Sequence, residues 1–489
     1  MTWRLAITST VLVLVLAGPA MAAVSTRPTP TPTPTPASMP SPIPEPTMLP
    51  VPMPANVPTP SGAVGIPSAA SPVPLSLRDA KMIAVQKSPQ LELARATLDL
   101  AGATLETANS AAFPQINASG SANRNKGQTR TGTTVGGITS SIFSSNTASI
   151  TIQQLIFDGG ATYARISEAK YSRDAAALSA LREVDIVLFN VAQLYYTALQ
   201  ARYTYQVAIE SRKLAEVQEA LVEAQFRAGV ASKADVLTAQ LPVAQARLAE
   251  AQAANGEQSQ VAALLNAMGV SSDTPVALNY EPESQVPTLP QYSTVQSIAL
   301  AQRTDLQAAH ASLTAAERGV RAARASRYPA ITGNGSIGTA TTGVDSAGHV
   351  VTNGGAWAST YSFGVGVTLP LYDSGLINGQ IASAEANTRS AAANLTSSEL
   401  GVSLSVRQAY LSAQTALQQV AAAKVELDQA QTVLDVTNAQ YKAGVTTLPL
   451  LLNAQVGLTK ANGDWVNALF AAYTAQQNLY FAEGIIANR

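Results

Sequence analysis

The chain has 489 residues, of which only 12% are charged, compared with about 25% in typical soluble domains. Its 30 basic and 31 acidic residues leave a formal net charge of -1, so the charge balance gives no reason to expect nucleic acid as a partner. Cysteine is absent, which excludes disulfides, thiolate metal sites, cysteine catalysis and a lipid-modified N-terminal cysteine.

The first 22 residues have the pattern of a secretory signal peptide. Arg4 precedes an apolar run at 11–16, and residues 20–22 form a small-x-small cleavage pattern. A membrane-anchoring helix is the weaker alternative, because the apolar run is shorter than the ~20 residues that span a bilayer. Residues 23–75 are rich in proline and are expected to form an extended, disordered linker, either a plain tether or a spacer that reaches the cell wall.

The remaining chain contains an internal repeat with an offset of 215 residues. The segment Gln225 to Gln240 returns as Gln440 to Gln455, and the offset persists along most of the mature chain. A repeat of this length indicates two copies of one structural unit. We place the copies at 76–274 and 291–489, with a short link at 275–290.

Each copy is expected to begin with a helix and two strands. In the first copy the helix covers 76–112 and ends before Pro114, because a residue that precedes proline is pushed out of helical space. The two strands of about ten residues alternate apolar and polar side chains. A loop rich in Gly, Ser and Thr separates them, at 125–146 in the first copy and at 340–357 in the second.

A long helix of about 69 residues then follows each second strand, with Asp158 and Asp373 at the expected N-caps. A tight turn and a return helix of about 37 residues complete each copy. The glycines of the two turns suit the left-handed conformation that ends a helix. The residues of the two turns are Arg227, Ala228, Gly229 and Val230, and Lys442, Ala443, Gly444 and Val445.

Heptad-like apolar spacing predicts that each pair of long helices forms an antiparallel hairpin. In the first copy we expect the interface of the hairpin to contain two sets of residues, Leu214, Val217, Leu221 and Ala224 before the turn and Leu237, Leu241, Ala244, Leu248 and Ala251 after it. A flanking set on the second long helix is expected to contact a further helix: Val420, Ala423, Leu427, Ala430 and Leu434.

The four strands have the length and alternation of tilted transmembrane strands. Four strands cannot close a barrel, and an open sheet edge in lipid leaves backbone groups unpaired. Several chains are therefore expected to combine, and eight, twelve or sixteen strands all satisfy this argument. The alternative is a soluble β-layer within a helical filament.

These features together resemble the TolC-type outer membrane efflux proteins. The resemblance rests on the two-copy layout, the helix-to-strand junctions at Phe113 and Tyr328, the LIFDGG and LPLYDSG junctions at 155–160 and 369–375, and the two glycine turns. It implies a mixed α and β membrane protein that forms a homotrimer. Its transmembrane β-barrel would have four strands per chain, about twelve in the trimer, and would continue as a long periplasmic α-helical barrel of coiled-coil hairpins.

The resemblance also implies a function, a location and partners. The chain would be the outer membrane channel of a multi-component efflux or type I secretion system of a Gram-negative bacterium, in contact with outer membrane lipid. Its turns would meet a periplasmic adaptor protein that is bound to an inner-membrane pump. No catalytic, cofactor or metal site is predicted, since the GNGSIG sequence at Gly333–Gly338 lies in a strand and the two histidines are far apart. The alternative function is a trimeric structural or adhesive surface protein with a coiled-coil stalk.

In this family the periplasmic entrance is commonly narrowed by aspartates and by an aromatic residue near the turn. The candidate entrance residues by position are Asp235, Tyr441 and Asn453. Leu450 stands where the second copy would carry the matching acid, so an acidic gate would depend on Asp235 alone. The alternative for Asp235 is a solvated charge that the helix dipole favours near a helix start.

Overall fold

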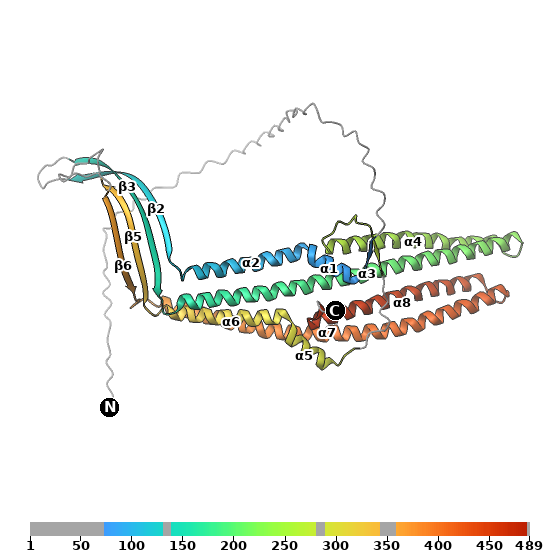
Figure 1. Cartoon of the computed structure of the whole chain (residues 1–489). Helices are drawn as coiled ribbons and strands as arrows, with labels where there is room; N and C mark the ends of the chain where they lie inside the picture. The colour runs from blue at the N-terminus through green and yellow to red at the C-terminus, as the bar shows by residue number, and fades with distance from the viewer. Residues whose placement is uncertain (1–72, 131–137, 280–288, 343–357, 487–489) are drawn as a thin grey trace, which may run out of the picture. The chain divides into compact units, whose positions relative to one another are not determined.

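The computed structural model describes residues 73–130, 138–279, 289–342 and 358–486 (Figure 1). The predicted signal peptide and residues 23–72 of the predicted linker lie outside these ranges. The same is true of parts of the two predicted loops and of the link between the copies.

The helices of the described residues recur with the offset of 215. The first copy contains α1 (Leu77–Lys87), α2 (Pro89–Ser110), α3 (Ala161–Arg227) and α4 (Lys233–Ala267). The second copy contains α5 (Tyr292–Gln302), α6 (Thr304–Ala325), α7 (Leu376–Lys442) and α8 (Leu448–Glu483). Within the described ranges, we find no helix with the combination of length and apolar character that crossing a membrane requires.

The first helix of each copy is divided in two, so the expectation of one continuous helix at 76–112 was wrong. Ser88 breaks the first copy with ψ of 124°, because Pro89 excludes the helical conformation from the residue before it. Arg303 adopts nearly the same conformation, with ψ of 121°, although no proline follows it. Its guanidinium instead donates to the Asp305 carboxylate at 3.0 Å and to Ser405 Oγ at 2.8 Å, so contacts with neighbouring residues hold the second break.

Asp158 and Asp373 contribute to the helix starts, but not as the N-cap residues that we expected. The N-caps of α3 and α7 are Gly160 and Gly375, both in the left-handed conformation. The Asp158 carboxylate accepts hydrogen bonds from the backbone N–H groups of Gly160 and Thr162, and Asp373 has equivalent bonds. Each aspartate therefore satisfies N–H groups of the first helical turn from two residues before the N-cap.

Four strands form an antiparallel sheet in the order β2-β3-β5-β6. Their bounds are β2 (Gln115–Arg130), β3 (Ile138–Phe157), β5 (Ala330–Thr342) and β6 (Ala358–Thr368). The first two strands have 16 and 20 residues, so our expectation of ten residues, with a loop at 125–146, was wrong for the first copy. Backbone ladder bonds continue through polar residues such as Asn123 and Ser145, where side-chain alternation gave no signal.

The two faces of the sheet differ in chemistry. Ile116 lies opposite Ile152, and Ile152 lies opposite Gly335, which in turn faces Phe363. This face is apolar and exposed, with Phe363 80% accessible. On the other face, the hydroxyls of paired serines such as Ser119 and Ser149 lie within hydrogen-bond distance, 3.0 Å apart.

A second, two-stranded sheet was not predicted. Strand β1 (Val73–Leu75) pairs in parallel with β4 (Val276–Leu278). The Tyr195 hydroxyl of α3 donates to the backbone carbonyls of Leu75 and Asn279, and Arg202 Nη1 donates to the Leu278 carbonyl at 2.6 Å. The chain segments before α1 and after α4 are thus fixed to the middle of α3.

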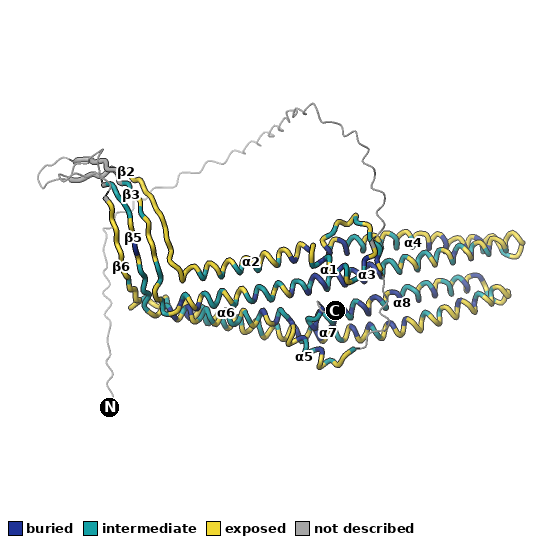
Figure 2. Tube along the Cα trace, viewed as in Figure 1, coloured by how far each residue is buried: buried dark blue, intermediate teal, exposed yellow. Residues whose placement is uncertain are grey.

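The largest apolar cluster lies where α1, α3 and α8 meet, and Figure 2 shows buried residues gathering there while α2, β2 and β6 are largely exposed. Aromatic rings join the two copies at this level. Phe189 stacks on Phe481 with centroids 4.7 Å apart, and Tyr196 stacks on Tyr473 at 5.3 Å. The α3–α8 interface therefore joins the two copies at this level, and α3 also packs along α6 of the second copy.

The predicted interface of the first hairpin was wrong for α4, and it was also wrong for two residues of α3, because Val217 is 68% exposed and Ala224 is exposed. Leu237, Leu241 and Leu248 are 57 to 61% exposed, and α4 instead packs on α3 through a neighbouring set of smaller residues. The buried residues of α4 in these contacts are Val236, Ala239, Val243 and Ala246. Smaller side chains let two helices approach closely, so the leucines beside them face outwards.

Candidate functional site: the ends of the helical hairpins

The two turns at the hairpin ends have the same backbone structure. Gly229 and Gly444 have φ of 77° and 72°, which confirms the predicted left-handed conformation. Val230 N–H donates to the Gln225 carbonyl at 2.9 Å, and Gly229 N–H donates to the Phe226 carbonyl. The second turn has equivalent bonds. This pattern is the Schellman motif, which satisfies the last carbonyl groups of the helix.

Both turns present the same kind of surface. The side chains of Val230 and Val445 are 80% and 77% exposed, and a basic residue, Arg227 or Lys442, occupies the last turn of each long helix. Ala228 and Ala443 are the C-cap residues. Each end thus carries an exposed valine next to a cation.

Asp235 takes part in a capping box at the start of α4. Its carboxylate accepts a hydrogen bond from Ser232 N–H at 2.9 Å, and Ser232 Oγ accepts one from Asp235 N–H at 3.1 Å. Hydrogen bonds from Ser232 also hold the pKa of Asp235 below its ordinary value. The Asp235 carboxylate therefore has a structural role at the start of α4, whether or not it also narrows the entrance.

The start of α8 has no such box. Thr447 is the N-cap, but its side chain makes no capping hydrogen bond, and the third helical residue is Leu450, which cannot accept a bond from the backbone. Pro449 lies in the first turn, where its missing N–H group costs nothing. The sequence difference between the two turns is thus a difference in how the return helices begin.

Tyr441 joins the second hairpin to the first. Its hydroxyl donates to Gln225 Oε1 at 2.8 Å. Burial raises the pKa of the Tyr441 hydroxyl, and the negative charge of Asp235 raises it further. The structure therefore brings Tyr441 and Asp235 together. Sequence reasoning missed Gln225, although its position three residues before the C-cap, repeated at Gln440, was a usable signal.

Asn453 lies apart from this group. It is exposed and lines a shallow groove of about 480 Å³ between α7 and α8, together with residues that include Leu450 and Gly457. Of the three candidate entrance residues, Asp235 and Tyr441 are thus neighbours across the two hairpins and Asn453 is not part of their cluster.

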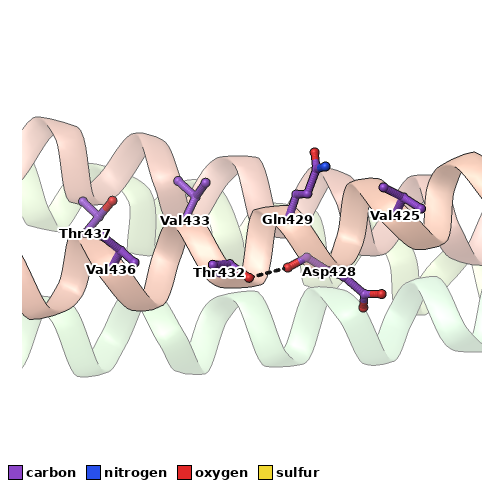
Figure 3. Close-up of a pocket in the computed structure, with 7 residues that line it drawn as sticks. All are labelled: Val425, Asp428, Gln429, Thr432, Val433, Val436 and Thr437. Carbon is purple, nitrogen blue, oxygen red and sulfur yellow. Dashed lines mark hydrogen bonds between the residues drawn. The ribbon is translucent and has the colours of Figure 1, made fainter.

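A second groove, of about 590 Å³, runs along the outside of α7 (Figure 3). Val425, Val433 and Val436 line it and are 52 to 55% exposed. The polar atoms along its edge belong to neighbours such as Thr432, whose hydroxyl donates to the Asp428 carbonyl at 2.8 Å. This helix face is apolar and, in the single chain, open.

Among the described residues, the GNGSIG sequence does not have the setting of a nucleotide-binding loop. The Gly333–Gly338 segment lies inside β5, so it forms no turn before a helix that could hold phosphate. Among the side chains that the structure describes, no group of three His, Asp or Glu residues could hold a metal ion.

Comparison with known proteins points to one family. The model of the family described as "Outer membrane efflux protein" matches residues 83–270 and 295–484. The chain is 28% identical over 402 residues to protein CyaE of Bordetella pertussis, covering 81% of this chain and 79% of CyaE. It is 26% identical over 416 residues to the probable efflux pump outer membrane protein TtgC of Pseudomonas putida, covering 81% and 80%.

A solved structure shares the fold. The structure of the outer membrane protein VceC from Vibrio cholerae aligns with a TM-score of 0.69 and 22% identity, covering 83% of this chain and 96% of that chain.

Proposed function

Because the chain belongs to the outer membrane efflux protein family, we propose that it forms the outer membrane channel of a multi-component efflux or type I secretion system. It is a passive duct from the periplasm to the exterior, and it performs no catalysis. The observation that carries this function is the joining of an apolar-faced antiparallel sheet to helices of 67 residues. The sheet suits the outer membrane, and the helices form a large periplasmic part.

The free edges of the sheet support a closed assembly of several subunits. The strand order places β2 and β6 at the two edges, and each edge leaves a row of backbone groups without a ladder partner in this chain. In lipid, each unpaired group costs several kcal/mol. Pairing of β6 of one subunit with β2 of the next subunit removes this cost. A homotrimer then has a barrel of twelve strands.

The length of the helices supports a periplasmic duct. A helix of 67 residues is about 100 Å long at ~1.5 Å per residue. At the level of the turns each chain contributes four helices, α3, α4, α7 and α8, so a trimer surrounds its entrance with twelve. This distance separates the turns from the membrane and makes them the periplasmic end.

We propose that the turns dock a periplasmic adaptor protein that is bound to an inner-membrane pump, which supplies the energy for transport. The exposed Val230 and Val445, with Arg227 and Lys442 beside them, support this role. The related protein TtgC is named as part of an efflux pump, which agrees with a partner of this kind.

We propose further that Asp235, Tyr441 and Asn453 narrow the entrance. The hydrogen bond from Tyr441 to Gln225 supports this for the pair of hairpins, since it holds the two turns together. Opening of the entrance would then require this bond to break.

Conductance of the purified protein in a planar lipid bilayer tests the function directly. Stable single-channel currents are expected from the assembled trimer. A trimer that inserts without conductance would overturn the duct and favour a structural or adhesive surface protein. Deletion of the gene, followed by tests of sensitivity to antibiotics and metal ions, identifies the class of cargo.

A further inference from the structure

The break between α1 and α2 forms a groove on the surface of the first copy. The groove has a volume of about 530 Å³, and its lining includes Lys87, Ser88, Glu92, Leu93 and Arg95. These residues come from the end of α1 and the first two turns of α2 (Figure 1). The start of a helix of 22 residues therefore opens into the groove, and the channel function proposed above assigns it no role.

The start of α2 presents unpaired hydrogen-bond donors. The first N–H groups of a helix have no partner within the helix, and the helix dipole adds a partial positive charge there. Pro89 has no N–H group, so Gln90 and Leu91 supply the donors of this end. Ser88 is the N-cap, but its side chain makes no capping hydrogen bond. The helix end is thus positive and lacks a side-chain acceptor among the described residues.

Ser88 is a second and separate sign of a ligand site. The residue is only 6% exposed, although it lines the groove. Its hydroxyl has no hydrogen-bond partner among the residues that the structure describes. Side-chain polar groups that are buried this deeply normally have a partner. A ligand in the groove would provide the partner that Ser88 lacks.

The charges around the groove favour an anion. Lys87 and Arg95 both line it and are exposed. Glu92 is the one acid among the lining residues, and its carboxylate lies 3.4 Å from Arg95 Nη1 rather than on the N–H groups of the helix. Two cations and a helix N-terminus thus outweigh a single carboxylate.

The second copy shows how such a helix end is completed when an acid is present. Asp305 is the counterpart of Gln90, and its carboxylate accepts a hydrogen bond from Leu306 N–H at 2.9 Å. The same carboxylate accepts one from Arg303 Nε at 3.0 Å. In the first copy Ser88 and Gln90 replace Arg303 and Asp305, so this position has neither the carboxylate nor its cation.

The basic residues of the groove belong to the first copy alone. Lys87 corresponds to Gln302, and Arg95 corresponds to His310. The first copy therefore carries cations without an acid at the helix start, whereas the second copy carries its own acid there. An anion from outside the chain would complete the start of α2 as Asp305 completes the start of α6.

The end of α4 holds the groove in a fixed shape. Gly269 follows α4 with φ of 71°, and a Cβ placed on it would clash with the Lys87 carbonyl oxygen. This close approach fixes the break between α1 and α2 against the end of α4. A ligand therefore meets donors that are already in position, which reduces the entropic cost of binding.

We propose that the groove at the start of α2 binds a carboxylate-bearing ligand. The carboxylate accepts hydrogen bonds from the first N–H groups of α2 and from Ser88 Oγ, and it pairs with Lys87 and Arg95. Leu93, which is 70% exposed, offers apolar surface to a short side chain beside the carboxylate. The ligand is a small carboxylic acid or the carboxyl end of a peptide. This site is separate from the channel and does not depend on it.

Substitution of Gln90 tests the site by filling it from within the chain. Gln90→Asp introduces the acid of the second copy, which is expected to occupy the helix end and weaken carboxylate binding on the order of ten-fold. Gln90→Asn has the same size without the charge and is expected to bind as the wild type does. Saturation-transfer NMR on the full chain in detergent measures the dissociation constant of the probe N-acetylalanine, and circular dichroism shows that each variant is folded.

The cations and the probe are varied in the same experiment. The double variant Lys87→Gln with Arg95→Gln is expected to weaken binding by roughly ten-fold, since each exposed cation contributes up to about five-fold. N-acetylalanine amide, which has no charge, is expected not to bind. Tighter binding of N-acetylalanine than of acetate would identify a peptide carboxyl end as the ligand, and equal binding would identify a small carboxylic acid.

Three results would overturn the site. They are equal affinity of the wild type and the folded Gln90→Asp variant, equal affinity for the acid and amide probes, and no saturation transfer to N-acetylalanine in the wild type. Each of these results leaves the channel function untouched, because conductance in a planar bilayer tests that function separately.

Discussion

The hydroxyl of Tyr441 reaches across from the second hairpin to Gln225 of the first, with 2.8 Å between the two oxygen atoms. Burial and the nearby Asp235 raise the pKa of the tyrosine, so the hydroxyl keeps its proton and remains a donor at neutral pH. The ends of two hairpins from different copies of the repeat are thus connected by one polar contact.

Removing this hydroxyl is expected to loosen the entrance. Tyr441→Phe keeps the ring and its apolar contacts but loses the hydrogen bond, whose net contribution is about 1 kcal/mol. A change of that size shifts an opening equilibrium roughly five-fold. Single-channel recording should therefore show higher conductance or longer openings. Tyr163→Phe, at an 80% exposed tyrosine, is the control, and equal conductance of Tyr441→Phe and wild type would contradict a connecting role.

The turn glycines provide a test of adaptor docking. Nothing lies within 4 Å of a Cβ placed on Gly229 or Gly444, so a substitution there acts on the backbone conformation rather than through a clash. Valine in the left-handed region costs about 1–3 kcal/mol, whereas asparagine tolerates it. Valine at both positions is expected to abolish export and co-purification of the adaptor while the trimer remains. The variant with asparagine at both positions should retain export and co-purification of the adaptor. Export by the valine variant would refute docking at the turns.

Charge and capping can be separated at Asp235. Ser232→Ala removes the capping partner and keeps the carboxylate, whereas Asp235→Asn removes the charge. If the charge narrows the entrance, cation selectivity in a planar bilayer should fall in Asp235→Asn and stay unchanged in Ser232→Ala. Equal selectivity in all three proteins would leave Asp235 with the capping role alone.

The capping box itself predicts a difference between the two return helices. Ser232→Ala should increase hydrogen exchange in the first turn of α4, and Thr447→Ala, at an N-cap without a side-chain bond, should change α8 less. Because the pKa of Asp235 is lowered in the folded protein, its stabilising effect is present above the unfolded pKa of about 3.9. The effect is lost as the pH falls through the lower folded pKa. Equal increases in hydrogen exchange in Ser232→Ala and Thr447→Ala would contradict the stabilising role of the capping box.

The sequence was informative where a local signal and the repeat agreed. The left-handed glycines at 229 and 444, the long helices and the alternation in the strands follow from spacing and from single residues with strong preferences. The family resemblance could be recognised because junction motifs recur at the same offset, and the family match confirms it.

The sequence was uninformative where one pattern of residues is compatible with two different structures. On α4 the leucines and the smaller residues beside them both have helical spacing, and only the approach of α3 shows that Val236 and Ala239 are buried. The break at Arg303 has no proline and depends on contacts with Asp305 and Ser405. The β1–β4 pair joins segments about 200 residues apart, and such long-range pairing leaves little trace in a short window.

A buried charge cluster stands at the level of the Arg303 break. Arg182 Nη1 lies 3.6 Å from Asp185 Oδ2, its Nε lies 3.8 Å from Asp305 Oδ2, and its guanidinium lies over the Phe481 ring. Arg182 and Asp185 are 8% and 6% exposed. Ser397 is the counterpart of Arg182 in the second half of the repeat. The arginine therefore occurs in the first half only, where it contacts residues of the second half.

Truncating this arginine is expected to be costly. Arg182→Ala leaves Asp185 buried without its partner, and breaking a buried pair costs about 3–5 kcal/mol. Chemical unfolding in detergent, followed by circular dichroism, measures the loss. Arg95→Ala is the control, because its ion pair with Glu92 is exposed and such pairs contribute about 0–1 kcal/mol.

The pH dependence of the same variant identifies the cause. Burial raises the pKa of Asp185, and the attraction of Arg182 opposes this rise. Without Arg182 the folded pKa rises further, so the folded state binds a proton more readily than the unfolded state does. Stability from this group is then complete below the unfolded pKa and is lost as the pH rises through the folded pKa. Arg182→Ala should therefore recover part of its lost stability, relative to wild type, as the pH falls from neutral towards about 5. An equal deficit at both pH values would mean that lost packing on Phe481, rather than the unpaired Asp185, causes the destabilisation.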